Sequence, residues 1–108
     1  MAYGGGFGGG ANMQQLMKQA QQMQKKLAEA QEEIAETEVT GSASGGMVEV
    51  TLLANKTPVS INIKKEAVDP DDVEMLEDLI LAAFNDALAK ADAVSKDLMG
   101  PLGNTGLF

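Results

Sequence analysis

The sequence predicts an α+β fold with the element order α-β-β-β-α, in which three antiparallel strands follow one long helix and precede another. Two observations carry this prediction. Apolar residues recur every three or four positions over 13–34 and again over 73–98, which is the spacing of an amphipathic helix. Residues 47–63 instead alternate apolar and polar side chains and are rich in β-branched residues, as strands are.

The first twelve residues contain six glycines. Such a composition is typical of a flexible chain, so we expect residues 1–12 to form a flexible Gly-rich tail. A phosphate-binding loop follows a strand, and we expect no strand before these glycines.

Residues 13–36 are expected to form the first helix, because they are good helix formers without an interrupting Gly or Pro. Asn12 is its expected N-cap. Its apolar residues are spaced alternately three and four apart, and such a seam needs a helical partner. Either the second helix or the same helix of a partner protomer could supply it. The seam consists of Met13, Leu16, Ala20, Met23, Leu27, Ala30 and Ile34.

The strand pattern begins at residues 37–40 and is expected to break at Gly41–Gly46. A second strand is expected over 47–54 and, after a turn at 55–58, a third over 59–63. We expect the buried face of the third strand to carry Val59, Ile61 and Ile63. One apolar face of such a sheet needs cover, which a helix or a second protomer could supply.

The second helix is expected over residues 69–98. Asp69 is its predicted N-cap, Pro70 its first helical residue, and Gly100 with Pro101 its end. We expect a single α+β domain over 13–98, followed by a flexible C-terminal tail over 99–108.

A chain of 108 residues is one small domain, and a projecting helix leaves it little core. We therefore expect a homodimer. The absence of Cys excludes a disulfide framework and fits a cytoplasmic protein. We expect no association with a membrane, because there is no signal peptide and no apolar stretch of about 18 residues.

An enzyme is not expected, since the chain has neither His nor Cys to act as base, nucleophile or soft metal ligand. We therefore predict no catalytic residue, cofactor or small-molecule substrate. Asp69, Asp71, Asp72 and Glu74 form an acidic cluster, but helix capping accounts for it. The cluster lacks the glycine and the distant glutamate of a calcium loop, so we predict no metal site.

Charge is unevenly distributed along this chain, whose net charge is −8. Residues 13–28 carry three Lys and no acid, whereas the end of the first helix and the second helix are acidic. Lys18 and Lys25 fall opposite the seam, with Lys26 nearby. A dimer would present two such helices to a duplex, and the lack of Arg predicts weak sequence preference. The alternative is an acidic protein-interaction module whose contact with DNA is incidental.

Three stretches resemble the YbaB/EbfC family of bacterial nucleoid-associated proteins. They read LMKQAQQMQ at 16–24, VTGSASGGMVEV at 39–50 and VDPDDVEMLEDLI at 68–80, the last continuing through AAFNDA at 82–87. The match runs nearly from end to end.

The resemblance implies a tweezer-like homodimer whose sheets associate while paired helices project. It also implies a cytoplasmic, nucleoid-located protein that binds double-stranded DNA with low sequence specificity and influences nucleoid organisation and gene expression. Lys18, Gln19 and Gln22 match the family's motif on the projecting helix and are expected to contact DNA. The charge distribution adds Lys25 and Lys26 to this expected DNA-binding set.

Overall fold

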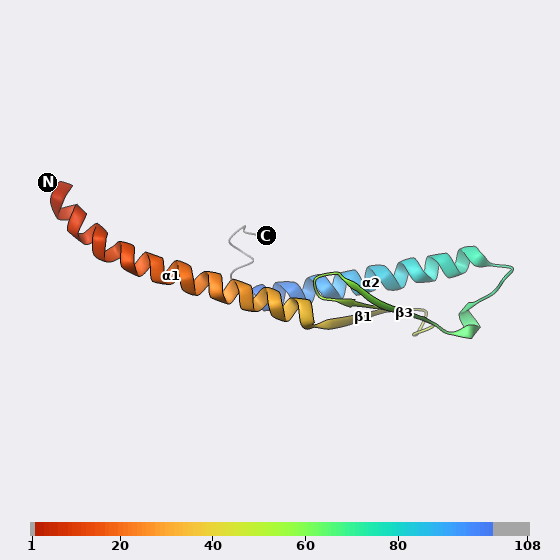
Figure 1. The fold of residues 1–108 in the computed structure, drawn as a ribbon. Coiled ribbons are helices and arrows are strands. Elements are labelled where there is room, and N and C mark those ends of the chain that lie inside the picture. Colours follow the sequence, from red (N-terminus) through yellow and green to blue (C-terminus); the bar gives the residue numbers. More distant parts are fainter. Residues whose placement is uncertain (1, 101–108) are drawn as a thin grey trace.

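A computed structural model describes residues 2–100 of the chain, with side chains from residue 12 onward. It confirms the α+β class and the predicted order of the long elements, with one short 3-10 helix added before the last helix (Figure 1). In chain order the elements are α1 (Ala2–Glu36), β1 (Glu38–Ala43), β2 (Val48–Leu53), β3 (Pro58–Ile63), η1 (Lys65–Ala67) and α2 (Val73–Met99).

The three strands form one antiparallel sheet in the order β1-β2-β3. β1 does not break at Gly41 as expected but continues to Ala43 and pairs Gly41 with Val50. The reason for a glycine here is the close approach of α2. A Cβ built at Gly41 would overlap the backbone nitrogen of Ala87 and the backbone oxygen of Ala83.

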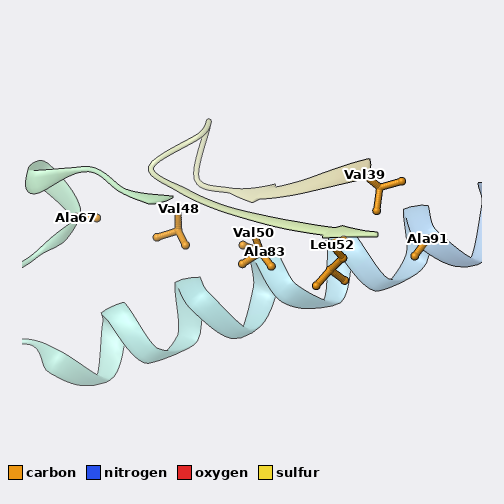
Figure 2. Close-up of a cluster of buried hydrophobic side chains, with 8 residues drawn as sticks. Val39, Val48, Val50, Leu52, Ala67, Ala83 and Ala91 are labelled. Carbon is orange, nitrogen blue, oxygen red and sulfur yellow. The ribbon is translucent and has the colours of Figure 1, made fainter. Parts of the chain in front are cut away.

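The main core lies between the sheet and α2, which packs chiefly over β1 and β2. Figure 2 shows the β2 side chains directed at the helix, and Val48, Val50 and Leu52 are at most 1% exposed. Full burial of such a side chain contributes about 1.5–3 kcal/mol. On α2, alanines at every fourth position form the contact, and their small size lets helix and sheet come close. The core cluster consists of Val39, Val48, Val50, Leu52, Ala67, Ala83, Ala87 and Ala91.

α2 begins at Val73, four residues later than expected, and Asp72 rather than Asp69 is its N-cap. The Asp72 carboxylate accepts a hydrogen bond from the Met75 backbone N–H, with 3.1 Å between oxygen and nitrogen. Asp69 instead organises the preceding turn. Its side chain accepts from Asp71 N–H at 2.9 Å, and its carbonyl accepts from Asp72 N–H at 2.9 Å. Pro70 therefore lies in a turn and not in the helix.

The other end of α2 matches the expectation more closely. The helix continues one residue further, to Met99, and Gly100 caps it with φ 52°. Because Met99 is buried, it belongs to the folded body rather than to a tail. The remainder of the expected C-terminal tail, residues 101–108, lies outside the described residues.

α1 extends back to Ala2, so Asn12 lies inside the helix and is not its N-cap. No proline interrupts residues 2–36, and nothing in the sequence therefore forces the helix to begin at Met13. Each interior glycine costs a helix about 1 kcal/mol relative to alanine. The six glycines consequently make this end the least stable part of α1, and its flexibility stays a prediction.

The last turns of α1 pack against the end of α2. Ala30 and Ile34 are buried in a second, smaller cluster with Ala54 and Met99. From this junction α1 leaves the body, as Figure 1 shows. The protomer measures 82 × 21 × 16 Å and has a radius of gyration of 22.5 Å, against about 13 Å for a compact domain of this size. The protomer therefore consists of an arm, which is α1, attached to a small body formed by the sheet and α2.

Candidate nucleic-acid interface

The five residues predicted to contact DNA all lie on the arm, and all five are exposed. At about 100° per residue, their positions fall within an arc of about 120° on α1. The helix thus gathers them on one face about 12 Å long. We call this face the basic face; it consists of Lys18, Gln19, Gln22, Lys25 and Lys26.

The outer half of the apolar seam lies on the other side of α1. The inner seam residues Leu27, Ala30 and Ile34 pack on the protomer's own α2, so for this half of the seam the helical partner is α2. In contrast, Leu16 is 59% exposed and Met23 is 45% exposed. The seam therefore has a partner within the protomer only along its inner half.

Both ion pairs found among residues 12–100 lie in the body. Lys56 pairs with Asp92 at 3.0 Å, and Lys90 pairs with Asp86 at 3.2 Å. Neither involves α1. Within the described part of the chain, the arm lysines therefore form no ion pair and can meet an external anion.

A set of hydrogen bonds fastens the body that supports the arm. Asp86 on α2 accepts from Ser42 N–H on β1, and the Lys90 ammonium donates to the Thr40 carbonyl at 3.0 Å. The Ser42 hydrogen bond, followed by Lys90, lowers the pKa of the Asp86 carboxyl below its ordinary value of 3.8. The sequence shows Asp86 and Lys90 at helical spacing, but it does not show that β1 lies beside them.

A groove of about 570 Å³ lies where the arm leaves the body. Sequence reasoning missed it because it exists only where α2 ends beside α1. We call it the junction groove. Its walls are Gln19, Gln22, Met23 and Lys26 of α1 and Asp97, Leu98, Met99 and Gly100 of α2.

The outer edge of the sheet has an uncovered apolar side. Val59 and Ile61 on β3 were expected to be buried, but they are 48% and 53% exposed in the protomer, while Ile63 is half-buried. Ile61 pairs with the core residue Val50, so both side chains lie on the face of the sheet that α2 occupies. The face is therefore the predicted one, but α2 packs chiefly over β1 and β2 and leaves β3 open in the protomer, so cover of β3 by a second protomer stays a prediction.

The adjoining flank of α2 is apolar too. Asp92 reaches Lys56 in the β2–β3 turn, which identifies the flank of α2 that faces β3. Leu88 and Leu81 precede Asp92 by one and three helical turns and therefore lie on the same flank. Leu88 is half-buried and Leu81 is exposed. This flank and β3 lie on the same side of the molecule, and we define the β3 patch by their residues Val59, Ile61, Leu81 and Leu88.

The described part of the chain contains neither a metal cluster nor a membrane span. Across the residues whose side chains are described, no three His, Cys, Asp or Glu side chains gather closely enough to hold a metal ion. Neither long helix, over its described residues, offers an apolar stretch long enough to cross a membrane.

Comparison with known proteins gives consistent results. The family model of the YbaB/EbfC DNA-binding family matches residues 9–107. A nucleoid-associated protein of Agathobacter rectalis is 52% identical and aligns over 100% of both chains. One of Staphylococcus aureus strain Newman is 55% identical over 85% of this chain and 88% of its own. An uncharacterized protein of Helicobacter pylori has the same fold, with a TM-score of 0.69 and 24% identity over 86% of this chain and 96% of its own.

Proposed function

The chain belongs to the YbaB/EbfC DNA-binding family, and from this premise we propose that it binds duplex DNA in the bacterial nucleoid as a homodimer with little sequence specificity. One observation carries the proposal. The basic face of α1 is exposed and without an acidic partner among the described side chains, although the chain as a whole has a net charge of −8.

The charge distribution limits where DNA can bind. Lys18, Lys25 and Lys26 all precede Glu29 on α1, whereas the inner end of α1 is rich in glutamate. Phosphates are attracted to the first region and repelled from the second. DNA contact is thus confined to the arm, and the glutamines of the basic face add hydrogen bonds to phosphates and base edges.

The homodimer is supported by what the protomer leaves exposed. The β3 patch is apolar and borders an unpaired strand edge, which is a surface that proteins normally cover. We propose that two protomers associate through this patch. Association there buries the patch while leaving both arms free, so that the dimer grips one duplex with two basic faces.

Low sequence specificity follows from the side chains available. Specific readout of guanine depends mainly on Arg or Lys placed against base edges in the major groove, and this chain has no Arg. With about six lysines engaged per dimer, most of the binding free energy comes from counterion release. Effects on nucleoid organisation and gene expression would follow from coating or bridging DNA.

A fluorescence anisotropy titration with duplex DNA at ~50 mM salt tests the proposal. We expect the wild-type protein to bind duplexes of unrelated sequence with similar affinity. The double variant Lys25→Glu/Lys26→Glu should lose binding, whereas the matched control Lys64→Glu/Lys65→Glu, with the same charge change in the body, should lose much less. Failure of the wild type to bind at protein concentrations on the order of tens of micromolar would refute the proposal.

The family and the names of the relatives favour this role over an acidic protein-interaction module, and they point to DNA binding rather than to catalysis. In such a module, α2 and the seam would capture a basic or apolar protein. Capture of this kind would survive reversal of the arm charges, so the same double variant separates the two roles.

A further inference from the structure

The junction groove has an apolar floor that is only partly covered. Met99 is 7% exposed and Leu98 half-buried, but Met23 beside them is 45% exposed. α2 covers the seam of α1 as far as Leu27 and then stops. Met23 is the first seam residue beyond that end.

We propose that residues 101–108 of the same chain dock in the junction groove, with Leu107 and Phe108 covering Met23 and Leu98. The segment continues directly from Gly100, which is itself part of the groove wall. Its position in the chain therefore delivers it to the groove at a high effective concentration. This proposal does not depend on DNA binding.

The dimensions of the groove suit this segment. Along α1 the groove extends from Gln19 to Lys26, which is about 10 Å at 1.5 Å per residue. Eight extended residues span up to about 26 Å. The segment can therefore turn at Gly100 and still bring its last two side chains onto the apolar floor.

The charges of the groove favour the same occupant. Lys26 and Asp97 lie on opposite walls, and residues 101–108 contain no charged side chain, so neither wall repels the side chains of the segment. A second copy of α1 would bring charged side chains into the groove, and a DNA phosphate would meet Asp97. A segment without charged side chains and with the apolar residues Leu102, Leu107 and Phe108 fits better than either.

Docking would have a consequence for the basic face. Gln19, Gln22 and Lys26 line the groove and would lie beside the docked segment, whereas Lys18 and Lys25 are not part of the groove wall. The segment would then separate the basic face into a covered edge and a free remainder.

A single introduced thiol tests the docking, because the chain has no cysteine of its own. Gln22→Cys places the thiol in the groove wall, and the control Gln21→Cys places one on the same helix outside it. The rate of alkylation by N-ethylmaleimide is measured in each, with and without Leu107→Ser/Phe108→Ser. We expect the serine pair to accelerate alkylation of Gln22→Cys about tenfold, which corresponds to ~1.4 kcal/mol, and to leave Gln21→Cys unchanged.

Equal rates for Gln22→Cys with and without the serine pair would overturn the proposal, whether both are fast or both are slow. Exchange of protomers provides a second experiment. Gln22→Cys chains are mixed with an excess of cysteine-free chains carrying the serine pair. Protection that persists assigns the segment to its own chain, and protection that disappears assigns it to the partner, which would also overturn the proposal.

Discussion

The carboxylate of Asp86 on α2 accepts a hydrogen bond from the backbone N–H of Ser42 on β1, with 3.0 Å between oxygen and nitrogen. The same carboxylate pairs with Lys90, whose ammonium reaches the Thr40 carbonyl. β1 is thus joined to α2 by polar contacts at the rim of their apolar interface. These contacts between β1 and α2 help to hold together the body that carries the arm.

Stability should therefore depend on the ionisation of Asp86. Its pKa is lowered in the folded protein, so its contribution is present above the ordinary value of 3.8 and is lost as the pH falls through the lower folded value. Asp86→Asn should reduce Tm at pH 7, and the difference from wild type should shrink in acid. Thermal unfolding followed by circular dichroism measures this. Asp78→Asn, which removes an exposed acid of the same helix, should show a much smaller difference at pH 7.

Gly41→Ala should destabilise the protein by at least about 1–3 kcal/mol, the usual cost of forcing extra atoms into a packed interface. The added methyl would meet backbone atoms of Ala83 and Ala87, which cannot rotate away as a side chain could. Urea unfolding gives the free energy directly. Ser42→Ala, an exposed position next to it, is the control, and an unaltered midpoint for Gly41→Ala would contradict the close packing.

Lys18→Gln should weaken DNA binding at every sequence and flatten its salt dependence. Removing one lysine–phosphate ion pair from each protomer reduces the slope of log K against log[salt] by about one, hence by about two for a dimer that engages both arms. Titrations at several salt concentrations measure this slope. A reduction of only one would indicate that a single arm touches the duplex.

Ile61→Asp should separate the homodimer. Each dimer would lose the burial of two isoleucines, worth at least about 1.5 kcal/mol each, so the dissociation constant should rise at least about a hundredfold. Sedimentation velocity over a dilution series measures the change. Asn62→Asp adds the same charge on the opposite face of β3 and should leave the dimer intact, whereas a wild-type protein that sediments as a stable protomer would exclude this interface.

The sequence predicts the elements of this fold well because the deciding patterns are local. The alternation of Val48, Val50 and Leu52 and the fourfold spacing of Ala83, Ala87 and Ala91 appear in the chain as they appear in the core. Where the prediction fails, the deciding contact is distant. Gly41 looks like a strand breaker until α2 is placed on it, and the sequence does not show that α2 leaves Val59 and Ile61 open in the protomer.

The same distinction applies to the site. Helical periodicity alone places Lys18, Gln22 and Lys25 on one face, and the structure shows that face exposed. The junction groove could not be predicted, because it depends on where α2 ends, at Met99, relative to Met23 of α1, which lies 76 residues earlier in the chain. Whether the basic face contacts DNA stays a prediction.

The attachment of α1 turns a small packing detail into a large displacement. Ala30 and Ile34 are held at the junction, and Lys18 lies about 24 Å further out along a single helix. A tilt of about 10° at Ile34 therefore swings Lys18 through about 4 Å. In a dimer the gap between the two arms is set by this lever, so substitutions at Ile34 should alter which widths of nucleic acid can be gripped without touching any lysine.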